Sequence, residues 1–140
     1  MQTFLSYSDF AKSAACLDNK RLGKQRVECL QILKALSDSS YGWQNHPAVK
    51  MWRDYTGALI CYGRAICLEW RDKRGFNDTC FEKIVDIASP FGNMPAWFGN
   101  EQFHASHRSN LLRKDYIYYS KFGWTEPIDL PYIWPITFKK

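Results

Sequence analysis

The sequence predicts a single compact all-α domain over residues 1–140, with four to five helices and an irregular, aromatic C-terminal tail. Three observations lead to this fold class. Apolar residues recur at helical spacing in several segments, which Gly, Pro, Asn and Ser separate. Hydrophobic residues make up 46% of the 140-residue chain, enough for one buried core. No alternating apolar–polar run is long enough to predict a strand.

The first element is an extended, apolar start, MQTFLSYSDF, which leads into a short helix with Ser6 or Ser8 as its expected N-cap. A long helix is predicted from about Leu17 to Leu36, because the apolar residues there return to one face every three or four positions. The polar segment DSSYGWQNHP ends this helix.

A second long helix is predicted from Pro47 to about Lys73. Proline suits the first helical position because it has no amide hydrogen to leave unbonded. Apolar and aromatic residues continue at helical spacing until Gly75, which ends the helix. A shorter helix is then expected, with Asp78 or Thr79 as its cap and the segment SPFGNMP as its end.

The last predicted helix runs from about Asn100 to Lys114. The tail that follows, DYIYYSKFGWTEPIDLPYIWPITFKK, is aromatic, contains several prolines and shows no period. A flexible linker does not carry so many large apolar rings. We therefore expect the tail to wrap irregularly over the helices.

The charge balance favours an anionic partner. The chain has 19 Lys and Arg against 14 Asp and Glu, a formal net charge of +5. Nucleic acid is the commonest partner of such a protein. The basic residues cluster in two groups, which are Lys20, Arg21, Lys24 and Arg26, and Arg108, Arg113 and Lys114.

The cysteine pattern predicts free thiols. Five cysteines without a CxxC pair fit neither a disulfide framework nor a zinc cluster, and no cofactor is expected. No charged-then-apolar leader opens the chain, and no apolar run reaches the roughly 20 residues of a membrane span. We therefore expect an intracellular, DNA-associated protein that does not contact a membrane.

The first long helix carries polar residues where an amphipathic helix has apolar ones. Gln25 and Arg26 project into the apolar face, and Arg21 and Glu28 lie together along its edge. Burying such groups is costly unless each finds a partner. The pattern indicates either a functional site or a structural network of buried ion pairs, and periodicity alone does not choose between them.

Two further segments are candidates for contact with nucleic acid. In HASHRSNLLRKD, His104, His107 and Arg108 share part of a helix surface, with the aromatic run after them suited to stacking. A zinc pair is less expected there, because no third ligand is evident. In the loop GWQNHP, Asn45 and His46 precede a helix N-terminus, where they either bind an anion or cap the helix.

Five motifs carry a resemblance to a known family. They are MQTFL (1–5), LDNKRLGKQRVE (17–28), NHPA (45–48), HASHRSNLLRKD (104–115) and LPYIWP (130–135). With them the chain resembles the pyrimidine-dimer DNA glycosylases of the phage endonuclease V type, and most of all a bacterial and phage branch of that family. The likeness to the characterised phage enzyme is weaker than the likeness to the branch.

The resemblance implies a specific chemistry. In that family the N-terminal α-amine attacks C1′ of the deoxyribose, the base leaves, and β-elimination from the resulting imine nicks the strand. An α-amine suits this role because, unlike a lysine, much of it is unprotonated at neutral pH. A glutamate and arginines on the first long helix assist, which implies roles for Arg21 and Arg26. The segment YIYYSKFG resembles the family's aromatic tail.

Two departures from the family pattern affect the expected catalytic residues. The family's glutamate directly follows its first helix arginine, whereas Leu22 follows Arg21 here. Of the nearby carboxylates, Asp18 and Glu28, we favour Glu28 because it shares the face of Arg21. The family also exposes a threonine after methionine removal. Here the bulky Gln2 follows Met1, so the expected nucleophile is the amine of Met1, or of Gln2 if Met1 is removed.

The sequence thus predicts a DNA glycosylase with AP-lyase activity that excises damaged or modified pyrimidines, such as pyrimidine dimers. We expect a monomer that acts on double-stranded DNA without an obligate protein partner. The alternatives are a non-catalytic nucleic-acid-binding domain of the same fold and a glycosidic-bond enzyme for free nucleotides. The expected catalytic residues are Met1, Gln2, Arg21 and Glu28. The expected DNA-binding residues are Lys20, Lys24, Gln25, Arg26, Asn45, His46, His104, His107, Arg108, Asn110, Arg113, Lys114, Tyr116 and Tyr119.

Overall fold

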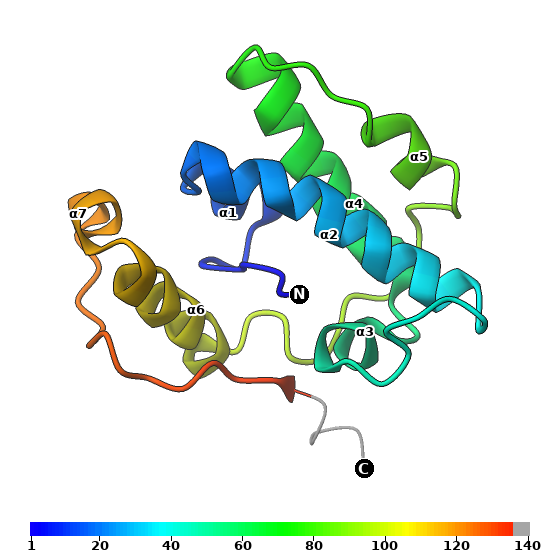
Figure 1. The fold of residues 1–140 in the computed structure, drawn as a ribbon. Coiled ribbons are helices and arrows are strands. Elements are labelled where there is room, and N and C mark those ends of the chain that lie inside the picture. The colour runs from blue at the N-terminus through cyan, green and yellow to red at the C-terminus, as the bar shows by residue number, and fades with distance from the viewer. Residues whose placement is uncertain (136–140) are drawn as a thin grey trace.

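The computed structural model describes residues 1–135, and every regular element in this range is helical (Figure 1). The predicted all-α class with an aromatic tail is confirmed. No helix in this range is long and apolar enough to span a membrane. The elements are α1 (Phe10–Ala15), α2 (Asn19–Ser37), α3 (Pro47–Trp52), α4 (Thr56–Leu68), the π-helical turn η1 (Glu69–Lys73), α5 (Phe81–Val85), α6 (Glu101–Lys114), α7 (Tyr116–Tyr119) and the 3₁₀ turn η2 (Ser120–Phe122).

Side-chain caps mark where the main helices begin. Asp18 accepts a hydrogen bond from the amide of the third residue of α2, and Asn100 does the same for α6. The cap of α1 is Asp9, so the prediction of Ser6 or Ser8 was wrong. Ser6 is fully buried in the extended start of the chain, which leaves the exposed Asp9 to take the capping position.

The second long helix is divided, and its prediction as one element was wrong. α3 ends at Trp52, and α4 begins at Thr56 after a break in which Asp54 has a φ of 74°. Apolar spacing continues across this short break, so the pattern alone does not reveal it. The end of the helix follows the prediction, because Gly75 adopts a φ of 74° that glycine accommodates without strain.

The core forms where α2 crosses α4 (Figure 1). Gly63 permits this close approach, because a Cβ there would lie 2.8 Å from the Cys29 sulfur. The five cysteines carry free thiols. The largest fully buried side chains include Trp52, Tyr62, Phe103 and Tyr119.

An extended segment, residues 1–8, runs between α6 on one side and α2 and α4 on the other (Figure 1). It has no neighbouring strand, so side chains must bond its buried amides. Gln25 Oε1 of α2 and the Tyr62 hydroxyl of α4 each lie 3.1 Å from the Phe4 nitrogen. His107 Nδ1 of α6 accepts from the Leu5 amide at 2.8 Å.

The carbonyls of this segment are bonded in the same way. Arg108 donates to the Ser6 carbonyl at 2.7 Å, and the Tyr132 hydroxyl donates to the Thr3 carbonyl at 2.8 Å. His104 Nδ1 lies 2.7 Å from the Leu5 carbonyl, while its Nε2 accepts from the Gly99 amide at 2.9 Å. His104 is therefore a neutral ring with its proton on Nδ1.

The tail packs along α6 as an irregular segment, as predicted. Ser109 donates to the Pro127 carbonyl at 2.5 Å and accepts from the Leu130 amide at 3.0 Å. The short helix α7 and the turn η2 come before this irregular part, and the sequence analysis did not predict either of them. Asp115 caps α7 by accepting from the Tyr118 amide.

The buried histidines predict a loss of stability in mild acid. Burial lowers the pKa of His104 and lowers that of His107 well below the ordinary value, with Arg108 adding to both shifts. The unfolded chain therefore binds more protons than the folded one below about pH 6.5. We expect the free energy of unfolding to fall by up to about 1.4 kcal/mol per pH unit for each histidine between pH 6.5 and 5.

Urea unfolding at several pH values measures this slope. The matched variant is His107→Asn, because the amide oxygen of asparagine can take the place of Nδ1 as the acceptor for Leu5. In this variant the unfolding free energy should fall less steeply with decreasing pH, because only His104 still contributes to the slope. An equal slope in the variant and the parent protein would contradict the assignment.

Candidate functional site

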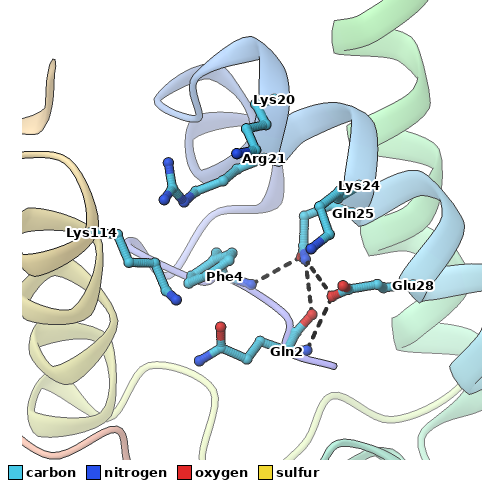
Figure 2. A pocket seen from close by; sticks show the side chains of 8 residues that line it. All are labelled: Gln2, Phe4, Lys20, Arg21, Lys24, Gln25, Glu28 and Lys114. Carbon is cyan, nitrogen blue, oxygen red and sulfur yellow. Dashed lines mark hydrogen bonds between the residues drawn. The ribbon is translucent and has the colours of Figure 1, made fainter.

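A small pocket of about 170 Å³ opens between the start of the chain, α2 and the end of α6 (Figure 2). Four cationic side chains and one carboxylate surround it, so it suits a ligand with negative charge. It is lined by Gln2, Phe4, Lys20, Arg21, Lys24, Gln25, Glu28 and Lys114.

Helical spacing brings most of these residues together. Lys20, Lys24 and Glu28 follow one another at intervals of four along α2, so they share one side of that helix. Lys114 ends α6 and reaches the pocket from the opposite side (Figure 2). Partial burial and the nearby charges of Arg21, Arg113 and Lys24 lower the pKa of Lys114.

Arg21 is held by the residue that caps its helix. Its Nη1 lies 3.2 Å from Asp18 Oδ1, and the same carboxylate accepts from the hydroxyl of Tyr119. Partial burial alone would raise the pKa of Asp18, but the hydrogen bonds from Tyr119 and Arg21 hold it below its ordinary value. The Tyr119 ring is fully buried and so is not available on the surface for stacking.

Arg26 points away from the pocket. Its Nη1 lies 2.6 Å from Asp78, whose side chain is fully buried, and its guanidinium stacks on the Trp70 ring at 4.4 Å. Asp78 also accepts from the amides of Cys80 and Phe81 at the start of α5. The N-cap residue of α5 is Cys80, so the prediction of Asp78 or Thr79 at that position was wrong, although the Asp78 side chain bonds the first amides. The structural interpretation applies to Arg26, which belongs to an ion pair. Arg21 and Glu28 line the pocket instead, where a functional role stays a prediction.

Glu28 contacts the first peptide nitrogen of the chain. Its Oε1 accepts from the Gln2 amide at 3.2 Å and from Gln25 Nε2 at 3.3 Å, and Gln25 Nε2 also donates to the Gln2 carbonyl at 2.9 Å (Figure 2). The amino nitrogen of Met1 has another partner, because it lies 3.4 Å from His46 Nε2. Met1 and Gln2 thus present their nitrogens to different side chains.

His46 caps α3, which confirms the capping interpretation of the GWQNHP loop. Its Nδ1 accepts from the Ala48 amide at 3.0 Å, so the neutral ring carries its proton on Nε2 and can donate to the Met1 nitrogen only when that amine is unprotonated. Partial burial lowers the pKa of His46, the positive charge at Met1 adds to this effect, and Glu28 opposes it. Asn45, next to it, is exposed.

The other predicted site residues divide by burial. His104, His107 and Arg108 are buried, and they bond the extended start of the chain. Asn110 is also buried. Arg113 and Tyr116 are exposed at the end of α6 and the start of α7.

Sequence reasoning missed two residues that fix the start of the chain, Tyr62 and Tyr132. Tyr62 lies on the apolar stripe of α4, where its hydroxyl gave no separate signal, and it bonds both the amide and the carbonyl of Phe4. Tyr132 comes from the aromatic tail, in which no period singles out one ring. Within residues 1–135 no cluster of three His, Cys, Asp or Glu side chains could hold a metal ion.

The placement of Arg26 predicts a structural effect of its loss. In Arg26→Met the Asp78 carboxylate stays buried without its cation, which costs about 3–5 kcal/mol. Urea unfolding measures this loss, and the exposed Lys24→Met on the same helix should change stability by less than about 0.5 kcal/mol. An Arg26→Met protein of parental stability would show that the ion pair does not support the fold.

The comparison with known families agrees with this geometry. The family model described as pyrimidine dimer DNA glycosylase matches residues 1–83, which include the extended start, α2 and the loop with His46. No curated protein and no solved structure matches the chain. The matched range covers more than half of the 140 residues and confirms the resemblance drawn from the motifs. The chain therefore belongs to the pyrimidine dimer DNA glycosylase family.

Proposed function

We propose that this protein is a DNA glycosylase with AP-lyase activity, which excises damaged or modified pyrimidines such as pyrimidine dimers from double-stranded DNA. The observation that carries the proposal is the contact of Glu28 with the Gln2 amide at the edge of a cationic pocket. The start of the chain, a carboxylate and a phosphate-binding surface then lie within one site. Membership of the family supports the same activity.

The first step is attack by the amine of Met1, or of Gln2 if Met1 is removed. The nitrogen forms a bond to C1′ of the deoxyribose, and the bond from C1′ to the base breaks. The electron pair leaves with the base, which takes up a proton. Glu28 lies 3.2 Å from the Gln2 nitrogen, so it can take the proton from the attacking amine if Met1 is removed. If Met1 is retained, the Gln2 nitrogen is a peptide amide, and the role proposed for Glu28 is to stabilise the cationic sugar.

The second step is the strand nick. The sugar ring opens first: the nitrogen forms a double bond to C1′ and loses a proton, while the C1′–O4′ bond breaks and O4′ takes up a proton. Loss of a proton from C2′ of this imine follows, and the 3′ phosphate departs with the electron pair of its C–O bond. The pocket volume of about 170 Å³ lies below the range of about 300–1,000 Å³ that is usual for ligand pockets. A pocket of this size is suited to part of a nucleotide, such as the sugar and a phosphate.

The exposed cations around the pocket would bind the phosphates on both sides of the attacked sugar. Lys20, Arg21 and Lys24 contact one stretch of the backbone from α2, and Lys114 contacts it from α6. Arg113, Tyr116 and Asn45 extend this surface. The buried Gln25, His104, His107 and Arg108 act indirectly, by holding the start of the chain against α2 and α6.

Borohydride trapping tests the chemistry. The protein is incubated with duplexes that carry an abasic site or a pyrimidine dimer, reduced, and analysed by intact mass and peptide mapping. We expect a covalent adduct on the first residue, and the free mass shows whether that residue is Met1 or Gln2. Glu28→Gln should slow adduct formation by about 10²-fold or more while it still binds the duplex.

The outcomes separate the candidate activities. No adduct with any of these substrates, together with salt-dependent duplex binding, would exclude the amine mechanism and leave a glycosylase without lyase activity or a non-catalytic DNA-binding domain of the same fold. Cleavage of the bond between base and sugar in the dimer duplex separates these two. Glu28→Gln with parental trapping rates would remove Glu28 from the mechanism and leave the amine in place.

Salt dependence of duplex binding tests the phosphate contacts. Lys24→Ala and Lys114→Ala should each weaken binding regardless of sequence and reduce the slope of log K against log salt by about 1. Lys34→Ala is the matched control, because Lys34 is exposed on α2 outside the pocket. Equal slopes of log K against log salt for all three variants and the parent protein would contradict the proposed phosphate contacts.

A further inference from the structure

The loop between α2 and α3 presents an aromatic ring in a strained backbone position. Trp43 has a φ of 73°, in the left-handed region that bulky residues rarely adopt. Its ring is 51% exposed, so core packing does not account for a tryptophan there. A glycine would adopt the same backbone without strain. Strain of this kind is found at binding and catalytic sites more than elsewhere.

The loop that carries Trp43 is held firmly. The side-chain amide of Gln44 donates to the carbonyls of Ala35, Asp38 and Tyr41 at 2.8, 3.0 and 3.0 Å. The His46 amide donates to the Trp43 carbonyl at 2.9 Å. The backbone that carries the exposed ring is therefore already ordered, so less conformational entropy is lost when the ring binds a partner.

Trp43 lies beside the start of the chain. Its ring makes an edge contact with His46, with centroids 5.7 Å apart. Nε2 of the same histidine lies 3.4 Å from the amino nitrogen of Met1. One side chain thus separates an exposed aromatic ring from the proposed nucleophile. Glu28, which lines the cationic pocket, bonds the next nitrogen along the chain.

We propose that Trp43 stacks on a nucleobase of the DNA next to the sugar that the amine attacks. This inference rests on the proposed function, since C1′ becomes accessible only when the duplex is locally unstacked. Opening the stack exposes the face of a base, and tryptophan binds such a face without regard to sequence. The cations that line the pocket favour a nucleic acid as the partner, because they would bind the phosphates of the strand whose base stacks on Trp43.

The test compares two substitutions of Trp43 that place the same demand on the backbone. Trp43→Phe and Trp43→Leu both keep a side chain at the positive φ, but only phenylalanine can stack. For a duplex with a stable abasic-site analogue, we expect Trp43→Leu to bind about tenfold or more weakly than the parent protein and Trp43→Phe to bind between the two. Phe91→Ala is the control, because Phe91 is 84% exposed in the loop after α5. It should bind like the parent protein.

Trp43→Gly separates stacking from a structural role. Glycine removes the ring and relieves the strained φ, so the melting temperature should stay equal or rise while duplex binding weakens. A lower melting temperature with parental affinity would overturn the proposal and make Trp43 a structural residue. Equal affinities of the Phe and Leu variants would also overturn it.

The proposed function has a separate readout. If the parent protein forms the borohydride adduct and every Trp43 variant binds as well as it does, the stacking proposal fails and the glycosylase proposal stands. If the parent protein forms no adduct, the proposed amine mechanism fails whatever the Trp43 variants do.

Discussion

The structure depends on one constraint, which is that an extended segment without a partner strand is buried among helices. Each buried amide or carbonyl left unbonded costs about 1–3 kcal/mol. The helices must therefore place polar side chains within hydrogen-bond distance of each of these backbone groups. Gln25, Tyr62, His107 and Arg108 meet this need from three different helices. Buried polar side chains thus hold the start of the chain in place by hydrogen bonds. The apolar side chains of the same segment, Phe4 and Leu5, belong to the core that α2 and α4 also form.

The same constraint places the chemistry. A terminus is normally the most mobile part of a domain, and a mobile amine is a poor nucleophile because each encounter must order it again. Here the bonds to residues 2–6 fix the chain direction, so the first nitrogens lie at the pocket beside Glu28 and His46. The ordering cost is met during folding, and cationic side chains line the pocket beside these nitrogens.

The sequence analysis predicted elements better than partners. Spacing located α2 and α6 and identified the inward face of α2, because helical periodicity is a local property. It did not identify the inward face of α6, where His104, His107 and Arg108 are buried. Spacing did not show what a buried polar residue meets. His107 bonds an amide 102 positions away, and Arg26 pairs with a carboxylate 52 positions away. Glu28 was favoured because it shares a helix face with Arg21, and both side chains do line one pocket. Its catalytic role stays a prediction. The break before α4 escaped because the apolar spacing continues across it.

The second residue has a consequence for the chemical lifetime of the site. An N-terminal glutamine cyclises spontaneously to a lactam and releases ammonia, which converts a free amine into an unreactive amide. Loss of Met1 would bring Gln2 to that position, where its nitrogen faces Glu28. A retained Met1 prevents this cyclisation, because the Gln2 nitrogen is then part of a peptide bond. Under the proposed mechanism, the amine of Met1 is the nucleophile in that case. The age of a protein sample, as well as its sequence, would then determine how much of it can form an imine.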